Sequence, residues 1–240
     1  MISDNQDIWI VLAAGGEGRR MGGAVRKQYL ALDGKRILEH TLERFNAFSW
    51  VSGMVLVTPA DVPEMAPLQA VYPRLYAIVS GGESRFQSVK NGVAAIPPQR
   101  CRTVLIHDAV RPIFSEALCE RVIADTTRVG AAIAALPLKG TIKASHGEQA
   151  LIAQTVNRAH LWEAQTPQGF SYPLLQSAYA QSGAWPPSDA ASLTDEAMLF
   201  ERLGLPVALV EGEETNIKIT RPLDLALAEA MLPASRQEGV

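Results

Sequence analysis

The sequence predicts an α/β fold in which helices flank a mostly parallel sheet. Short runs rich in β-branched residues alternate with amphipathic stretches, and this alternation is typical of βαβ units. Glycine turns follow two of the expected strands, where such a sheet presents its ligand crevice. The chain has 240 residues, 48% of them hydrophobic, and no linker or internal repeat. We therefore expect residues 1–232 to form one domain.

The first three elements are a strand at residues 8–13, a helix that starts near residue 37 and a strand at residues 51–57. Both strands are short apolar runs, and the helix carries an apolar face that we expect to pack into the core. That face consists of residues at helical spacing, namely Ile37, Leu38, Leu42 and Phe45.

The middle of the chain continues the alternation. A strand at residues 75–79 ends in a glycine turn, and a helix follows it. A strand at residues 103–107 has Asp108 at its carboxyl end. A helix at residues 115–128 leads to a strand at residues 130–136, whose small and β-branched residues suit burial on both faces. The inner side of the first of these helices is marked by Phe86, Val89 and Val93.

Between residues 137 and 157 the pattern changes to polar, glycine-containing segments around two short extended pieces, near 141–144 and 151–155. We expect a protruding β-hairpin arm here. The chain then resumes, and its expected elements are a segment at 172–181, a helix at 194–203 whose Asp195 and Glu196 suit the first turn, a strand at 207–210 and a last helix at 223–232. Residues 233–240 are expected to fray.

Composition and charge exclude several classes of function. Cys101 and Cys119 lie far apart with no histidine at metal-ligand spacing, so a zinc site is not expected. The net charge of −3 disfavours nucleic acid as a partner but permits a basic pocket for a small anion. No apolar run approaches the roughly 18 residues of a membrane span. Residues 1–7 lack the features of a signal peptide, so we expect a cytoplasmic protein without a membrane partner.

The loop after the first strand, Leu-Ala-Ala-Gly-Gly-Glu-Gly-Arg-Arg-Met at residues 12–21, predicts a phosphate site. Its small residues let backbone N–H groups approach phosphate oxygens. It is not a Walker A loop, and Met21 stands where the third glycine of a dinucleotide fingerprint belongs. Nearby cations could neutralise a triphosphate and the charge that develops during attack; the alternative is a solvated basic turn. These cations are Arg19, Arg20, Arg26 and Lys27.

Two further turns carry polar groups at strand ends. Residues 81–89, Gly-Gly-Glu-Ser-Arg-Phe-Gln-Ser-Val, open a helix whose N-terminus favours the polar edge of a ligand. Alternatively, Ser84 simply caps that helix. Asp108 and Arg111 lie three residues apart at a strand terminus. They could bridge two ligands, or they could pair with each other in a structural salt bridge.

The arm and the C-terminal part of the chain hold the remaining candidates. Thr141 lies on a candidate strand of the arm, and Arg158 closes the arm. An exposed arm has no core to serve, so we expect it to pack against a partner subunit and to lend polar groups across that interface. Lys218 lies between two isoleucines, and alternation makes it point opposite to them, either toward solvent or into the crevice.

In combination, these motifs resemble the 2-C-methyl-D-erythritol 4-phosphate cytidylyltransferase family. The resemblance runs in order from about residue 8 to residue 232. One departure is Arg26, because the family commonly has proline before its lysine, and this concerns the stiffness of the loop. The motifs are the glycine loop with Lys27-Gln28-Tyr29, the turn at 81–89, His-Asp-Ala-Val-Arg-Pro at 107–112, Thr141, Arg158, Ala-Gln-Thr-Pro-Gln-Gly-Phe at 164–170, Thr-Asp-Glu at 194–196, and Asn-Ile-Lys-Ile-Thr-Arg-Pro at 216–222.

The resemblance implies a Rossmann-like nucleotidyltransferase domain and a homodimer joined through residues 137–157. It also implies the reaction of CTP with 2-C-methyl-D-erythritol 4-phosphate, a step of non-mevalonate isoprenoid biosynthesis that releases pyrophosphate. Mg²⁺ would be bound mainly through the CTP phosphates, and no protein metal cage is expected.

The resemblance also assigns roles by position. Arg20 and Lys27 would stabilise the transition state at the α-phosphate, and Arg158 and Lys218 would position the acceptor for attack. Thr141 and Arg158 would come from the neighbouring subunit. CTP would be held by Ala13, Ala14, Gly15, Gly16, Gly82, Ser88, Asp108 and Ala109. The acceptor would be bound by Asp108, Arg111, Thr141, Arg158, Thr194 and Lys218.

The residue types agree with this chemistry. A phosphate monoester has a second pKa of about 6, so the acceptor is already an anionic nucleophile at neutral pH and needs no dedicated general base. The enzyme has to bring two anions together with fixed cations and Mg²⁺. The runner-up is a ribitol 5-phosphate cytidylyltransferase, although residues 161–164, Leu-Trp-Glu-Ala, look more like the erythritol enzyme. From other classes, a non-catalytic nucleotide-binding regulator and an NAD-dependent oxidoreductase stay open, and the missing third glycine counts against the latter.

Overall fold

The central sheet has seven strands in the order β11-β7-β10-β6-β1-β4-β5. The computed structural model describes residues 7–16, 25–62, 65–186, 188–189 and 192–237. Every pairing in this sheet is parallel except those of β10, which runs antiparallel to both β6 and β7. The strands are β1 (Ile8–Ala13), β4 (Val51–Thr58), β5 (Leu75–Ser80), β6 (Thr103–Asp108), β7 (Ala131–Pro137), β10 (Trp162–Ser171) and β11 (Ala208–Glu211).

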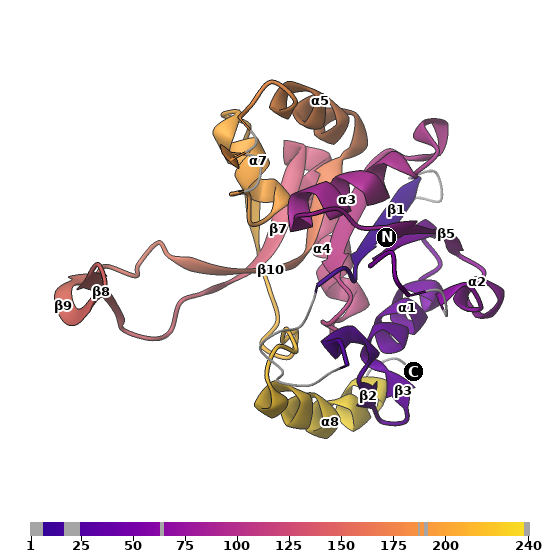
Figure 1. Cartoon of the computed structure of the whole chain (residues 1–240), viewed down its shortest axis with the longest axis horizontal. Coiled ribbons are helices and arrows are strands. Elements are labelled where there is room, and N and C mark those ends of the chain that lie inside the picture. Colours follow the sequence, from indigo (N-terminus) through magenta and orange to yellow (C-terminus); the bar gives the residue numbers. More distant parts are fainter. Residues whose placement is uncertain (1–6, 17–24, 63–64, 187, 190–191, 238–240) are drawn as a thin grey trace.

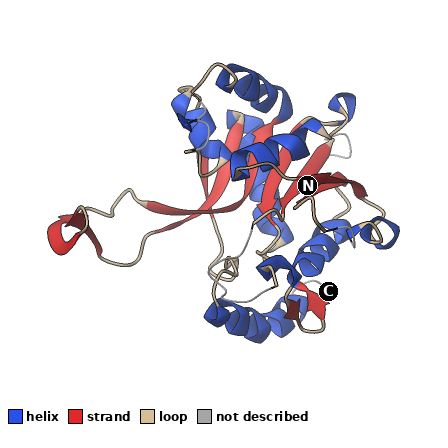
Figure 2. Ribbon diagram, viewed as in Figure 1, coloured by secondary structure: helices blue, strands red, loops and turns tan. Residues whose placement is uncertain are grey.

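Helices cover both faces of the sheet (Figure 1 and Figure 2). Alternate residues of β1 divide between two cores, because Ile10 and Leu12 pack with α1 and α4, whereas Trp9 and Val11 pack with α3, α5 and α7. The helices are α1 (Ile37–Ala47), α2 (Leu68–Val71), α3 (Arg85–Ala94), α4 (Glu116–Val129), α5 (Tyr172–Ser182), α7 (Glu196–Arg202) and α8 (Pro222–Gln237), with short 3₁₀ turns η2 (Lys27–Tyr29) and η4 (Pro98–Arg100). None of the described helices is both long and apolar enough to span a membrane.

A third, smaller core lies under α8. Leu32 and Ile37 from the first third of the chain pack there with Ile219, Ala228 and Leu232. A two-stranded ribbon of β2 (Ala31–Leu32) and β3 (Lys35–Arg36) joins η2 to α1. This core holds the segment around residue 218 close to residues 13–16, which follow β1, although the two segments are far apart in sequence. Helix α8 ends at Gln237 and so runs past residue 232 into the segment expected to fray.

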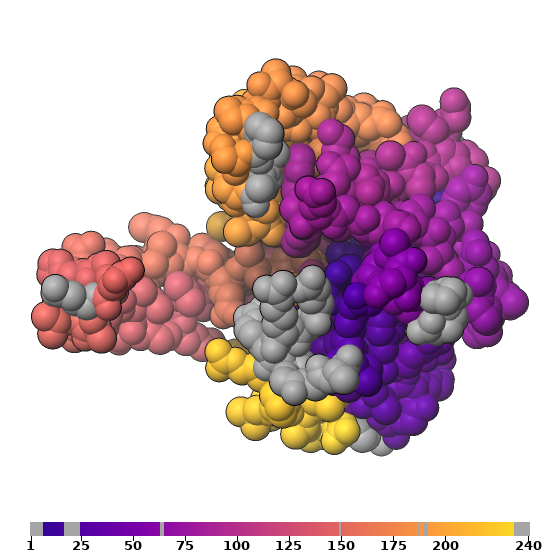
Figure 3. Space-filling view, in the orientation of Figure 1, coloured from indigo at the N-terminus to yellow at the C-terminus, as the bar shows by residue number. Residues whose placement is uncertain are grey.

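The predicted hairpin arm is present. Strands β8 (Ile142–His146) and β9 (Gln149–Val156) pair antiparallel, and the arm stands clear of the body in the space-filling view (Figure 3). Leu151 and Ile152 near its tip are 63% and 66% exposed. Large apolar side chains at that exposure suit contact with another chain. The mostly parallel sheet that the alternation predicted is confirmed, and with helices on both faces it has the Rossmann-like form that the family resemblance implied.

Strand β10 was not predicted. Its centre is polar and contains Pro167, and proline is normally confined to strand edges or bulges. In the structure the register between β10 and β7 shifts between Ala164 and Gln168, so Pro167 falls in the irregular stretch. The polar side chains around it, Gln165, Thr166 and Gln168, are buried and hydrogen-bonded. The hydrophobicity pattern therefore did not reveal this central strand, because its polar residues are buried in a hydrogen-bonded network and do not face water.

One glycine is required by close packing. A Cβ atom at Gly92 would lie 2.6 Å from a methyl group of Val57 and 2.7 Å from one of Val11. Glycine therefore lets α3 approach β1 and β4 closely. This approach places the N-terminus of α3 beside the loop that follows β1.

Candidate active site

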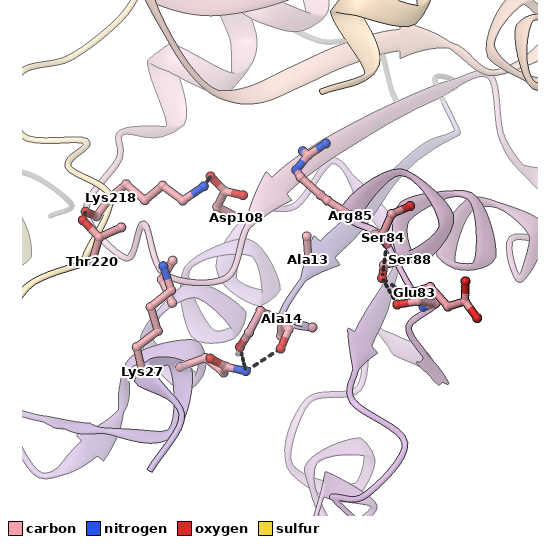
Figure 4. A pocket seen from close by; sticks show the side chains of 15 residues that line it. Ala13, Ala14, Lys27, Glu83, Ser84, Arg85, Ser88, Asp108, Lys218 and Thr220 are labelled. Carbon is pink, nitrogen blue, oxygen red and sulfur yellow. Dashed lines mark hydrogen bonds and ion pairs between the residues drawn. The ribbon is translucent and has the colours of Figure 1, made fainter. Parts of the chain in front are cut away.

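A cavity of about 570 Å³ opens at the carboxyl ends of the parallel strands (Figure 4). It lies where the loop after β1, the turn before α3, the end of β6 and the segment before α8 meet. Nine of the residues predicted from sequence line it, namely Ala13, Ala14, Gly15, Gly16, Lys27, Gly82, Ser88, Asp108 and Lys218. Its other lining residues are Gln28, Glu83, Ser84, Arg85, Val110 and Thr220.

The buried carboxylate of Asp108 pairs with two cations, Lys218 and Arg111. Lys218 Nζ lies 2.9 Å from Asp108 Oδ2, and Arg111 Nε lies 3.3 Å from the same oxygen. Burial alone would raise the pKa of Asp108, but Lys218, Arg85 and Arg111 together hold it well below its ordinary value. Asp108 therefore stays ionised. The salt bridge foreseen as the alternative for Asp108 and Arg111 is present, and Lys218 points into the crevice rather than away from it.

Gln28 holds the backbone of residues 14–16, directly after β1, by hydrogen bonds. Its side-chain nitrogen donates to the carbonyl oxygens of Ala14 at 2.6 Å and Gly16 at 3.1 Å. Both partners can only accept, so the amide nitrogen must face them. Gln28 is 1% exposed. The preceding residue, Lys27, is also buried, and its ammonium group points toward the cavity (Figure 4). Gln28 lay within a motif used for the resemblance, but its role as a brace was not predicted.

The turn before α3 both caps the helix and lines the cavity. Ser84 Oγ accepts the N–H of Gln87 at 3.1 Å, as the capping interpretation requires. Ser88 Oγ accepts the N–H of Gly82 at 3.0 Å and donates to the carbonyl of Ser84 at 2.8 Å. A Cβ atom at Gly81 would lie 2.8 Å from Ser88 Oγ, so a side chain there would displace the Ser88 hydroxyl from these bonds.

Arg85 is a site residue that the sequence did not single out. Its guanidinium donates to Glu196 Oε2 at 2.8 Å, and the Glu196 side chain is fully buried. Burial raises the pKa of Glu196, although Arg85 opposes the rise. Burial acts against the charge of Arg85, but Glu196 and Asp108 together raise the pKa of Arg85 well above its ordinary value. Arg85 is therefore a permanent cation on the cavity wall, and its ion pair with Glu196 of α7 holds it in place.

Buried His107 links the end of β6 to β10. Its Nε2 lies 3.0 Å from the carbonyl oxygen of Arg111, which can only accept, so Nε2 carries the proton. Nδ1 then accepts from the hydroxyl of Thr166 at 3.0 Å, and that hydroxyl accepts the backbone N–H of Asp108 at 3.1 Å. Burial lowers the pKa of His107 to about 4, so the ring is neutral at neutral pH. This chain of bonds fixes the backbone that presents Asp108.

The free energy of unfolding is expected to fall by about 2 kcal/mol between about pH 7 and about pH 5 because of His107. Its folded-state pKa of about 4 lies below its ordinary value of 6.5, so the unfolded chain binds more protons in this window and stability decreases as the pH falls. Urea unfolding of the wild type and of His107→Gln at both pH values measures the effect. The variant should lose most of this difference, and an equal difference in both proteins would contradict the assignment.

Asn216 and Gln165 extend the same network to the segment that carries Lys218. Asn216 Nδ2 donates to the carbonyl of Thr166 at 2.7 Å, and Arg111 donates to the carbonyl of Asn216 at 2.7 Å. Gln165 bonds the backbone N–H of Glu213 at 3.2 Å and its carbonyl at 2.9 Å. The polar centre of β10 therefore sets where Lys218 meets Asp108.

Several predicted residues lie off the cavity wall within one chain. Ala109 is beneath it, with its N–H bonded to the carbonyl of Ala13 at 3.1 Å. Thr194 is exposed before α7, and Thr141 and Arg158 are exposed at the base of the arm, where Arg158 donates to the carbonyl of Lys139. Arg20 lies outside the described residues. Across the part of the chain that the structure describes, no group of three or more His, Cys, Asp or Glu side chains could hold a metal ion.

A mostly parallel sheet that opens onto one cavity, with a glycine loop, two lysines and an arginine around that cavity, fits the class of α/β nucleotidyltransferases. Comparison with known proteins identifies the family. A model of the 2-C-methyl-D-erythritol 4-phosphate cytidylyltransferase family matches residues 8–234. The chain belongs to this family.

Individual relatives agree. The 2-C-methyl-D-erythritol 4-phosphate cytidylyltransferase of Syntrophus aciditrophicus is 40% identical over 233 residues, which are 95% of this chain and 96% of the relative. The solved structure of 4-diphosphocytidyl-2C-methyl-D-erythritol synthase from Anaerococcus prevotii superposes with a TM-score of 0.81 at 29% identity, covering 96% of this chain and 97% of that one. The Thermus thermophilus cytidylyltransferase structure has a TM-score of 0.74 at 34% identity, with 95% and 98% covered.

Proposed function

We propose that the protein transfers the cytidylyl group of CTP to the phosphate of 2-C-methyl-D-erythritol 4-phosphate, which gives 4-diphosphocytidyl-2-C-methyl-D-erythritol and pyrophosphate. The observation that carries this proposal is the meeting of the glycine loop with Lys27, Arg85 and Lys218 on one cavity. Such a cavity suits two phosphate-bearing ligands that repel each other in water. Family membership supports the same reaction.

In this reaction an acceptor phosphate oxygen attacks the α-phosphorus of CTP. The bond from that phosphorus to the oxygen bridging toward the β-phosphate breaks, and pyrophosphate leaves with the electron pair. No proton has to be removed from the nucleophile at neutral pH. The backbone of residues 13–16 would approach the phosphates, while Lys27, together with Arg20, would offset the charge that grows at the α-phosphate. Lys218, held by Asp108 at 2.9 Å, would receive the acceptor phosphate.

Mg²⁺ would enter with CTP and supply further positive charge to the phosphates. Asp108 and Glu83 are the carboxylate residues among those that line the cavity, and Glu83 turns its carboxylate away from Asp108 (Figure 4). A single inward carboxylate among the described lining residues fits an ion that is bound mainly by substrate phosphates. The nucleotide phosphates would therefore hold Mg²⁺, and Asp108 would be the protein carboxylate available to it.

The arm is proposed to complete the site of a second copy of the chain. It projects from the body, its tip residues Leu151 and Ile152 are exposed, and Thr141 and Arg158 do not line the cavity of their own chain. A two-fold dimer in which each arm packs on its partner would bury the apolar tip and bring Thr141 and Arg158 to the partner's cavity. Arg158 would then contact the acceptor.

Mixed dimers test this sharing of sites. Arg158→Ala and Lys27→Ala are each expected to reduce turnover strongly as homodimers. A heterodimer purified through two different tags should regain about half of the wild-type rate, because one of its two sites receives both wild-type side chains. Pyrophosphate release measures the rates. If Lys27 and Arg158 serve the same chain, every site of the heterodimer is damaged and no activity returns.

The proposed reaction is tested by pyrophosphate release when CTP, ATP, GTP and UTP are each combined with 2-C-methyl-D-erythritol 4-phosphate or ribitol 5-phosphate. We expect rapid release only with CTP and the erythritol phosphate. Preference for ribitol 5-phosphate would establish the runner-up function. Tight CTP binding without release under any combination would identify a nucleotide-binding regulator and overturn the proposal.

A further inference from the structure

Arg26, immediately before Lys27, forms an ion pair with Asp61, which lies in the turn after β4. Its guanidinium nitrogens lie 2.9 Å and 3.0 Å from the two carboxylate oxygens of Asp61. This two-point arrangement fixes direction as well as distance, which single-point surface pairs do not. The hydrogen bond from Arg26 lowers the pKa of Asp61, so the carboxylate is ionised at neutral pH.

Asp61 is a firm anchor because the chain on both sides of it is held. It follows β4, whose residues Val57 and Thr58 accept backbone bonds at 2.8 Å from Ala14 and Gly81, which flank the cavity. Beyond it, Val62 packs against the core that contains Leu38 and Leu42. The backbone that carries the Asp61 carboxylate is therefore held beside the cavity.

The backbone conformation of Arg26 explains why its side chain is needed to position the η2 turn. Its φ of −62° and ψ of 138° are extended, and its carbonyl accepts the N–H of Tyr29 at 2.9 Å to begin the η2 turn. A φ of −62° is the angle that a proline ring enforces. Arginine does not enforce it, so another constraint is needed to hold the backbone as it enters η2.

We propose that Arg26 and Asp61 form a positioning pair that holds Lys27 against the cavity. Gln28 ties the turn to the carbonyls of Ala14 and Gly16 on one side of Lys27, and the Arg26–Asp61 pair ties it to the end of β4 on the other. This inference rests on the proposed function, in which Lys27 acts at the α-phosphate. Since the side chains are 29% and 68% exposed, salt weakens the constraint.

Asp61→Asn tests the pair while keeping the shape of the side chain. At saturating substrates kcat is expected to fall about fivefold, which corresponds to about 1 kcal/mol, while the KM for CTP changes less. Arg26→Gln should give the same loss, and the double variant should lose no more than either single one. Asp125→Asn is the matched control, because it breaks the exposed Arg128–Asp125 pair of 2.7 Å on α4, and its kcat should equal that of the wild type.

A rescue variant distinguishes the loss of Lys27 positioning from a general loss of structure. Arg26→Pro combined with Asp61→Asn should recover most of the lost kcat, because the ring restores the angle without the charge. The ratio of wild-type to Asp61→Asn kcat should shrink as KCl rises from about 0.05 M to about 0.5 M. Equal kcat for Asp61→Asn and wild type, or a loss that neither proline nor salt alters, would overturn the positioning role. Absence of pyrophosphate release in the wild type and in Asp125→Asn would instead refute the proposed function.

Discussion

Replacing Lys27 with alanine is expected to lower kcat by about 10²-fold or more, with the fold intact. Lys27 lines the cavity on the short η2 turn, and Gln28 and Arg26 fix that turn from both sides. A cation held in place before the reaction stabilises the charge that develops at the α-phosphate without reorganising. Alanine removes that charge and leaves the binding of the remaining substrate groups largely in place. Initial rates of pyrophosphate release at saturating CTP and acceptor measure the loss.

Lys35→Ala is the control for the general loss of a lysine. Lys35 is paired with Glu43 on the surface and does not line the cavity, so its removal should leave kcat unchanged. A circular-dichroism melt should show that both variants fold. A Lys27→Ala enzyme with a wild-type rate would refute the role of Lys27 in transition-state stabilisation.

Replacing Glu196 with alanine is expected to reduce the free energy of unfolding by about 3–5 kcal/mol. The Glu196 side chain is fully buried, and Arg85 donates to it at 2.8 Å. Without Glu196, the Arg85 guanidinium is left partly buried without its main counter-ion, and a cavity remains where the carboxylate stood. Glu196 Oε1 has no hydrogen-bond partner among the described residues, in keeping with the raised pKa of this group. Urea denaturation at neutral pH measures the change.

Glu201→Ala provides the matched comparison. Glu201 lies on the same helix, α7, but is exposed, so its replacement should change stability by no more than about 0.5 kcal/mol. A Glu196→Ala protein that is as stable as Glu201→Ala would show that the buried pair contributes nothing to the fold. Loss of activity without loss of stability would instead assign Glu196 to positioning Arg85 alone.

Most of the fold could be predicted because its elements follow simple periodicities. The helix at 37 and the strands around β1, β4 and β6 have apolar residues at helical spacing or in short β-branched runs, and each appears where expected. Strand β10 could not be predicted from hydrophobicity, since Gln165, Thr166 and Gln168 are buried by hydrogen bonding and not by apolar contact. Helix α8 is longer than predicted because it continues through Pro233, a residue type that usually ends a helix.

The residues of the candidate site could likewise be predicted only in part. The glycine loop, Lys27, Asp108 and Lys218 could be predicted because small or charged residues stand out where an α/β sheet binds its ligand. Arg85 and Gln28 were missed as working residues because their importance depends on distant partners, Glu196 for one and two backbone carbonyls for the other. A sequence shows that a residue is charged or polar, whereas the partner that orients it depends on the fold.

A crystal structure of the protein with CTP, Mg²⁺ and 2-C-methyl-D-erythritol 4-phosphate is the most direct test of the claim that fixed cations bring two repelling anions together. We expect the triphosphate against residues 13–16, the α-phosphate within reach of Lys27, and the acceptor phosphate beside Lys218. A triphosphate bound elsewhere, or Lys27 and Lys218 turned away from both phosphates, would contradict it.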